Sequence, residues 1–121
     1  MARKLIRWGE VYWVDLSFPS KEEKEKGIIH ELQGFHPGVI VSNNQQNLFS
    51  PLITIIPLTS QIDKIYPFEV ETNLNNRKGK VIVDQITTID RKRLGDYLGR
   101  LEKRTMKEIQ NALHLTLAFE E

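Results

Sequence analysis

The 121-residue sequence contains no cysteine. This absence excludes disulfide bonds, a thiolate nucleophile and any zinc or iron–sulfur site built from cysteine ligands. An excess of one charge is also missing, because 17 Lys and Arg residues stand against 16 Asp and Glu residues and leave a formal net charge of +1. A polybasic nucleic-acid arm or a long disordered tail is therefore not the dominant feature of this chain.

Long apolar runs are missing too. No segment approaches the roughly 20 apolar residues of a membrane-spanning helix. Residues 1–8 are basic but contain neither the apolar core nor the small-residue cleavage site of a secretory signal. We therefore expect no membrane segment and a location in the reducing cytoplasm. The length and the 40% hydrophobic content predict one globular domain over residues 1–121.

Short segments rich in β-branched and aromatic residues predict a mainly β fold. The first segment is apolar at both alternating positions, which predicts burial on two faces as in a small closed barrel. Pro57 is expected to interrupt the third strand, because proline has no N–H to donate. The expected strands are residues 10–16, 38–42, 52–56, 66–71, 80–86 and 97–101.

The C-terminal segment has the spacing of a helix. Its apolar residues recur every three or four positions, at Met106, Ile109, Leu113 and Leu117. Thr105 and Glu108 fit a capping box, although a start near Lys103 also fits the pattern. Antiparallel strands followed by one amphipathic helix place the chain in the α+β class, with β structure dominant.

Charged residues are distributed unevenly along the chain. Residues 32–62 contain no Asp, Glu, Lys or Arg, whereas residues 77–93 hold six basic residues against Asp84 and Asp90, a local charge of +4. Such a cluster attracts RNA phosphates or an acidic protein segment, or it forms a pair of solvated loops. The basic residues are Arg77, Lys78, Lys80, Arg91, Lys92 and Arg93.

The segment 29–37 (IHELQGFHP) carries His30 and His36. An imidazole exchanges its proton near neutral pH and so serves as a general acid or base, although each histidine also fits a partly exposed loop position. His114 is interpreted as a surface residue on the polar face of the helix. The histidines and carboxylates show no metal-binding spacing, and the glycines form no phosphate or dinucleotide loop, so no metal or cofactor is expected.

Polar groups also follow the third expected strand, in residues 57–61 (PLTSQ). Hydroxyl and amide groups there either contact phosphate and ribose or satisfy the backbone at a turn. Asp84 lies within an apolar run, where a carboxylate needs hydrogen-bond donors or a cleft, and Gln85 shares this environment more weakly. Trp8 and Trp13 are interpreted as core or interface residues rather than as stacking platforms for bases.

Four blocks combine these features: residues 9–16 (GEVYWVDL), 30–37 (HELQGFHP), 57–60 (PLTS) and 84–94 (DQITTIDRKRL). Taken in this order, they resemble the MazF/PemK toxins, the ribonuclease component of type II toxin–antitoxin systems. The likeness extends over nearly the whole chain, and the last block is the most specific.

This resemblance implies a small SH3-like antiparallel β-barrel with a C-terminal amphipathic helix, working as a homodimer. It also implies a sequence-selective endoribonuclease that cleaves single-stranded RNA, including mRNA, without a metal or cofactor. The implied partners are this RNA, a cognate antitoxin whose acidic disordered segment occupies the RNA groove, and DNA bound together with the antitoxin. No membrane partner is implied.

The chemistry of such cleavage follows from RNA itself, which carries its own nucleophile in the 2′-OH. A base removes that proton, an acid protonates the leaving 5′-oxygen, and donors stabilise the phosphorane charge. The products are a 2′,3′-cyclic phosphate and a free 5′-OH. None of these steps requires a thiol, a metal or a cofactor.

The sequence departs from the family pattern at residues that would carry this chemistry. Most members have Arg where this chain has His36, and some have Arg where it has Ile82. Trp8 replaces the usual Arg before the first Gly-Glu pair. Losing a donor to the transition-state charge typically costs about 3–4 kcal/mol. His36 replaces part of this function when it donates or accepts the proton, and His30 matches a histidine found in part of the family.

We therefore expect His36 to act as acid or base and Thr59 to contact the phosphate or the 2′-oxygen. His30 and Asp84 are expected to support the proton transfers. The expected substrate-binding residues are Ser60, Gln61, Gln33, Gln85, Arg77, Lys78 and Lys80. Two other functions stay open: a catalytically weakened member that only binds RNA or antitoxin, and a gyrase-poison-like toxin that uses the same barrel.

Overall fold

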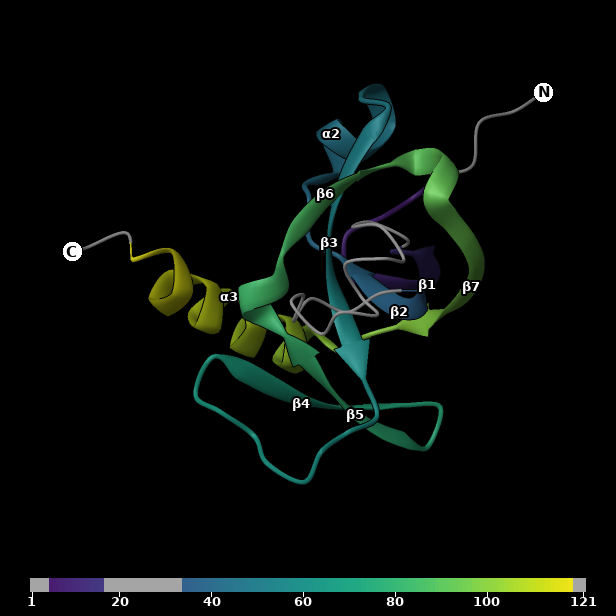
Figure 1. The fold of residues 1–121 in the computed structure, drawn as a ribbon. Helices are drawn as coiled ribbons and strands as arrows, with labels where there is room; N and C mark the ends of the chain where they lie inside the picture. The colour runs from purple at the N-terminus through teal and green to yellow at the C-terminus, as the bar shows by residue number, and fades with distance from the viewer. Residues whose placement is uncertain (1–4, 17–33, 119–121) are drawn as a thin grey trace, which may run out of the picture.

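The computed structural model of the chain describes residues 5–16 and 34–118. Within these residues, seven strands form an antiparallel sheet in the order β4-β5-β3-β2-β1-β7, and β6 pairs with β3. The sheet curls into the small barrel seen in Figure 1, as the sequence predicted. The strands are β1 (Glu10–Asp15), β2 (Phe35–Ile40), β3 (Leu52–Thr59), β4 (Glu69–Leu74), β5 (Arg77–Ile82), β6 (Thr87–Asp90) and β7 (Leu94–Arg100).

The sheet buries apolar side chains on both of its faces. Val11 belongs to one core cluster, whereas the next residue of β1, Tyr12, belongs to another. Ile56 and Ile55 of β3 divide between the two clusters in the same way. Successive side chains of a strand point to opposite faces, so a segment that is apolar at both alternating positions forms a strand buried on both sides. The prediction from the first strand is confirmed.

The expected interruption of β3 at Pro57 is wrong, because the strand continues through Pro57 to Thr59. One edge of β3 pairs with β2, where Pro57 stands opposite Gly38. The other edge pairs with β6 over residues 52–55 and with β5 over residues 58–59. Pro57 therefore lies where this second edge changes partner, a gap in the ladder that needs no N–H donor.

The connection between β2 and β3 contains the short helix α2 (Asn44–Phe49), whose buried contacts hold the two strands together. Asn47 is buried and donates from Nδ2 to the main-chain oxygen of Ser42 at 2.9 Å. The hydroxyl of Ser42 in turn accepts from the main-chain N–H of Thr54 at 3.1 Å. These bonds satisfy buried polar groups and support the register between β2 and β3.

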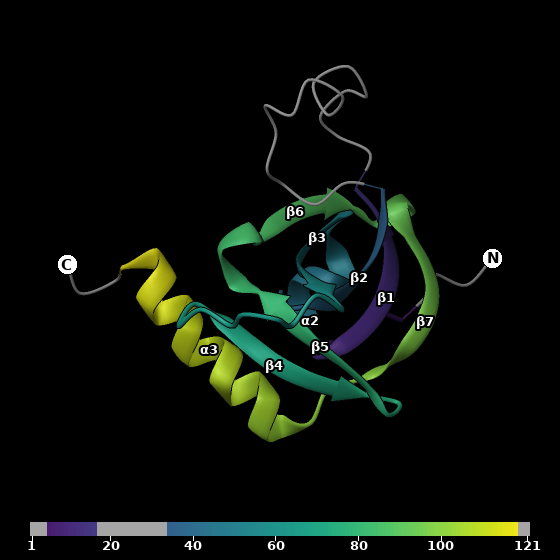
Figure 2. The same cartoon turned by 60° about the horizontal axis from the view of Figure 1, so that its bottom comes forward.

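Helix α3 (Lys103–Leu117) packs against β4 and the 3₁₀ turn η1 (Val83–Gln85), and Figure 2 shows it running alongside β4. It begins at Lys103 after the N-cap Glu102, so the alternative start is confirmed and the Thr105–Glu108 capping box is wrong. Met106, Ile109 and Ala112 are buried, whereas Leu117 is 48% exposed. In the described ranges no helix is long and apolar enough to cross a membrane.

The β4–β5 hairpin brings the two ends of the curled sheet together. Asn75 and Asn76 form its tight turn with positive φ angles of 53° and 64°, as asparagine permits. The side-chain amide of Asn75 donates to the main-chain oxygen of Leu98 in β7 at 2.7 Å. Gly99 lies beside this contact with φ 145°, and a Cβ there would meet Leu74 Cδ1 at 3.0 Å. A side chain at this position would be strained by the positive φ and would require a small shift of the Leu74 side chain.

Candidate functional site

A hollow of about 800 Å³ opens between the start of β2, the end of β3, the β4–β5 hairpin and β7. It brings together residues from several sequence blocks, which supports their interpretation as one site. Its polar and charged lining includes His36, Thr59, Ser60, Gln61, Asn75, Arg77 and Lys78. Its apolar lining includes Trp13, Phe35, Pro37, Leu58, Leu74 and Leu98.

The pairing of β2 with β3 explains why His36 and Thr59 line the same hollow. The register of these strands sets Gly38 opposite Pro57. His36 lies two residues before Gly38 and Thr59 lies two residues after Pro57, so both occupy equivalent positions on neighbouring strands. Both residues lie just beyond the paired stretch of the two strands, and both line the hollow. The hollow therefore contains an imidazole and a hydroxyl.

The strand that follows the hairpin turn supplies the cations. Arg77 and Lys78 are exposed and line the hollow. Gly79 packs against the end of β3, where a Cβ would meet the main-chain oxygen of Thr59 at 2.9 Å. This close approach holds β5 directly beside Thr59. The guanidinium and ammonium groups thus belong to the same concave surface as Thr59.

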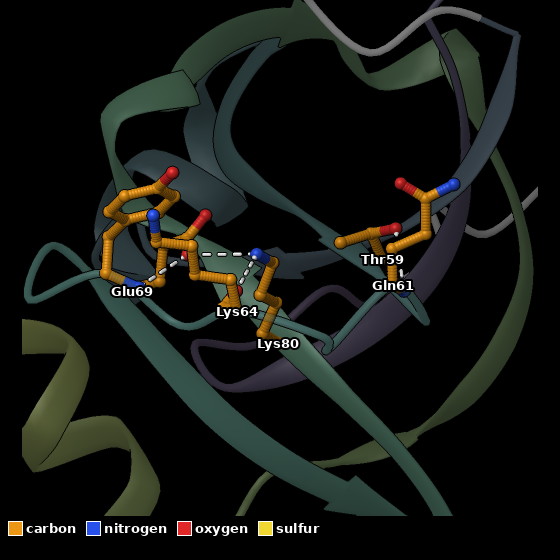
Figure 3. A network of polar contacts seen from close by, with 6 residues as sticks. Thr59, Gln61, Lys64, Glu69 and Lys80 are labelled. Carbon is orange, nitrogen blue, oxygen red and sulfur yellow. Dashed lines mark hydrogen bonds and ion pairs between the residues drawn. The ribbon is translucent and has the colours of Figure 1, made fainter.

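Lys80 lies differently from the substrate-binding position that we expected. It is 8% exposed, and its Nζ donates to Glu69 Oε1 at 2.9 Å and to the main-chain oxygen of Lys64 at 2.7 Å. Figure 3 shows the ammonium directed at these two acceptors, while Thr59 and Gln61 share a contact of their own. The expectation is corrected, because an ammonium engaged inside the protein is not presented to a ligand.

The environment expected for Asp84 is also wrong. The fifth strand ends at Ile82, and Asp84 lies in η1 as an exposed residue, with Gln85 partly buried beside it. Neither residue is among those that line the hollow. The exposed carboxylate is solvated, so it requires neither buried donors nor a cleft. His30 and Gln33 lie outside the described residues.

Two aromatic residues of the hollow were not predicted as functional. Trp13 is 37% exposed, and it pairs with Pro37 of β2, next to His36. Phe35, at the start of β2, is 69% exposed. The alternation along β1 does not single out Trp13, because Val11, two residues earlier on the same face, is buried in the first core cluster. Of the two positions expected for Trp13, the core is wrong, and the interface stays a prediction for this residue at the edge of the hollow.

A metal ion in a protein is held by several His, Cys, Asp or Glu side chains placed around it. Residues 5–16 and 34–118 contain no group of three His, Asp or Glu residues placed to hold one. The functional groups gathered in the hollow are an imidazole, hydroxyls, amides and cations. This set can bind a phosphodiester and move protons at it.

Comparisons with known proteins agree with this combination of fold and hollow. The sequence model of the PemK-like, MazF-like toxins of type II toxin–antitoxin systems matches residues 7–117. A protein of Staphylococcus saprophyticus subsp. saprophyticus, named Endoribonuclease MazF, is 32% identical over 120 residues, which cover 95% of this chain and 93% of the relative.

Solved structures resemble the whole barrel. An endoribonuclease in complex with its cognate antitoxin, from Mycobacterial species, has a TM-score of 0.76 and 29% identity, and the match covers 96% of this chain and 98% of that chain. MazF (Form-I) from Deinococcus radiodurans has a TM-score of 0.80 and 23% identity, covering 97% of this chain and 100% of that chain.

These likenesses define the fold class of the chain, which is a small curled antiparallel sheet with a C-terminal helix, as in MazF. The chain belongs to the PemK-like, MazF-like toxin family of type II toxin–antitoxin systems. The family resemblance inferred from the four sequence blocks is thereby confirmed.

Proposed function

We propose that this protein is a toxin that acts as a sequence-selective endoribonuclease on single-stranded RNA, including mRNA. The observation that carries the proposal is that His36 and Thr59, from adjoining strands, line one hollow together with Arg77 and Lys78. The curated relative at 32% identity, named Endoribonuclease MazF, supports the same reaction class.

In the proposed reaction, the 2′-OH of one nucleotide attacks the adjacent phosphorus and the bond to the 5′-oxygen breaks. One group removes the 2′ proton and another protonates the departing 5′-oxygen, so the products are a 2′,3′-cyclic phosphate and a 5′-OH. His36 performs one of these proton transfers, and Thr59 donates its hydroxyl to the phosphate. We assign the second transfer to His30, and we give Asp84 no part in the cleavage.

Arg77 and Lys78 have an electrostatic function in this proposal. Cations that already surround the phosphate stabilise the additional charge of the phosphorane without reorganising during the reaction. They also attract the RNA, since phosphate contacts dominate the affinity of nucleic-acid binding. The side chains of Ser60 and Gln61 contact the flanking phosphate or ribose, and the exposed face of Trp13 stacks on a base.

The same hollow would be the target of inhibition. We propose that a cognate antitoxin covers it with an acidic segment, whose carboxylates pair with Arg77 and Lys78. A solved relative at 29% identity is an endoribonuclease in complex with its cognate antitoxin. We further propose that the toxin works as a cytoplasmic homodimer and that DNA is bound together with the antitoxin.

A second candidate function is RNA or antitoxin binding without cleavage. Two positions that carry Arg in family members hold His36 and Ile82 here, and Ile82 is buried. An aliphatic side chain in this position offers no donor to a phosphate. Activity therefore depends on whether His36 replaces the missing guanidinium.

Incubation of purified protein with a mixed-sequence RNA in EDTA tests the proposal. We expect fragments that end in 2′,3′-cyclic phosphate and 5′-OH, and we expect His36→Ala to suppress their formation. His114→Ala is the matched control, because it removes an exposed histidine of α3, outside the hollow. Intact RNA at high protein concentration, together with binding of the same RNA, would establish the second candidate instead.

A further inference from the structure

The buried ammonium of Lys80 connects strand β5 to the segment that follows Thr59. The Lys80–Glu69 ion pair has an N–O distance of 2.9 Å, and its two side chains are only 11% and 7% exposed. Burial of a charge is costly unless partners compensate it, and here a carboxylate and a main-chain carbonyl do so. The position of this ammonium is therefore fixed by the protein interior.

Both hydrogen-bond acceptors of Lys80 belong to the connection between β3 and β4, residues 60–68, or to its end. Lys64 lies in the middle of this connection, and its carbonyl accepts from Lys80 at 2.7 Å. Glu69 lies at its end, where Oε1 also accepts from the main-chain N–H of Tyr66 at 2.9 Å. The main-chain N–H of Glu69 donates back to the oxygen of Tyr66 at 2.9 Å. One carboxylate thus fixes a turn, and Lys80 fixes that carboxylate.

The near end of the same connection lines the hollow. Thr59 stands opposite Lys80 in the β3–β5 register. Ser60 and Gln61 follow it, and the N–H of Gln61 donates to Thr59 Oγ1 at 3.3 Å. The backbone of Lys80 therefore supports Thr59, while its side chain holds the connection a few residues further on.

We propose that Lys80 is a positioning residue that holds residues 60–68 so that Ser60 and Gln61 face the substrate. It acts through the loop and does not touch the RNA. This inference rests on the proposed function, because the loop is assigned a substrate contact. A displacement of substrate contacts by about 1 Å can reduce the rate by about 100-fold, so a fixed loop has a measurable catalytic effect.

The central variant is Lys80→Met, which keeps much of the side-chain length and removes the ammonium. We expect kcat/KM for a defined RNA to fall about 10-fold to 100-fold, mainly through KM, in protein that circular dichroism shows to be folded. Lys80→Arg should restore most of the activity, because a guanidinium can donate to both acceptors. Lys107→Met is the matched control, since it removes an exposed lysine of α3.

Amide hydrogen exchange distinguishes positioning from a general loss of stability. In Lys80→Met we expect faster exchange in residues 60–66 and unchanged exchange in β1 and β2. Unchanged kcat/KM and unchanged exchange in a folded Lys80→Met variant would overturn the inference. Where Lys80→Met does not fold, Glu69→Gln removes the charge of the partner but keeps an acceptor, and the double variant Glu69→Gln/Lys80→Met leaves no uncompensated charge. In these variants, kcat/KM and amide exchange in residues 60–66 test the inference in the same way.

A 2′-O-methyl RNA, which lacks the nucleophile, separates failure of this inference from failure of the proposed nuclease activity. If the wild type cleaves RNA and Lys80→Met cleaves equally well, the positioning inference is wrong and the nuclease proposal stands. If the wild type does not cleave but binds the 2′-O-methyl RNA, weaker binding by Lys80→Met supports the positioning role and equal binding overturns it. A wild type that neither cleaves RNA nor binds the 2′-O-methyl RNA overturns both proposals.

Discussion

The side-chain amide of Asn75 donates to the main-chain oxygen of Leu98 at 2.7 Å, which joins the β4–β5 hairpin to β7. Strands β4 and β7 are the two ends of the strand order, so this hydrogen bond connects the ends of the curled sheet. Both residues also line the hollow. The contact that closes the barrel is therefore part of the wall of the proposed site.

Asn75→Gly tests this closure, because glycine keeps the positive φ of 53° and removes only the amide side chain. We expect a loss of about 1 kcal/mol in the free energy of unfolding, the usual net value of one hydrogen bond. We also expect a higher KM for RNA, since Arg77 and Lys78 follow the same turn. Urea unfolding and cleavage kinetics provide the two measurements. Asn76→Gly is the matched control with φ 64°, and equal effects of the two variants would contradict a closing role for Asn75.

Replacement of His36 tests its assignment to proton transfer. We expect His36→Ala to lower kcat by about 10²–10⁴-fold, the usual contribution of general acid–base catalysis. His36→Arg should keep electrostatic stabilisation, but a guanidinium stays protonated and cannot exchange its proton near neutral pH. The measurement is kcat/KM between about pH 5 and pH 9. Identical pH profiles for the wild type and His36→Arg would refute proton transfer by His36.

The sequence predicted the barrel well because its signals are local. β-Branched segments act within a few residues, and the structure places a strand at or near each expected range, although β2, β5 and β7 begin three residues earlier, β4 begins three residues later, and β6 was not expected. The interruption of β3 at Pro57 was predicted wrongly because it depends on which strands pair with β3 at that point. Whether a missing N–H breaks a strand is decided by what lies on that edge, and here the edge is changing from β6 to β5.

The position of some site residues could likewise be predicted from the sequence, whereas that of others could not. His36 and Thr59 were predicted from their blocks, and the structure places both in the lining of one hollow, where their catalytic roles stay a prediction. Lys80 and Asp84 were assigned from charge and from an apolar run, which do not define where a side chain points. The direction of the Lys80 ammonium is set by Glu69, which lies eleven positions earlier in the chain and across the β4–β5 pair. Such a contact is a property of the folded chain.

The two exposed cations of the hollow, Arg77 and Lys78, lead us to expect salt-dependent RNA binding. We expect Arg77→Gln/Lys78→Gln to weaken binding of a 2′-O-methyl RNA and to reduce the slope of log K against log salt by about 1.4, since each phosphate contact on single strands contributes about 0.7. Fluorescence titration over a series of salt concentrations measures this slope. Lys107→Gln on α3 is the control and should leave it unchanged. A double variant with the slope of the wild type would remove these two residues from the RNA-binding surface.

The buried phenol of Tyr12 makes a prediction about alkaline stability. Burial holds its pKa well above the usual value of about 10, and the hydrogen bond from Tyr12 Oη to Glu10 Oε1 at 3.0 Å and the negative charge of Glu10 raise it further. Above about pH 10 the phenol ionises in the unfolded chain but not in the folded one, so this contribution is complete below pH 10 and is lost as the pH rises. At pH 11 the loss amounts to about 1.4 kcal/mol.

Because Phe does not ionise, urea unfolding should show that the stability advantage of the wild type over Tyr12→Phe shrinks by this amount between about pH 8 and pH 11. Tyr66→Phe, at a residue 42% exposed, is the control. A constant difference between wild type and Tyr12→Phe over this range would contradict the raised pKa.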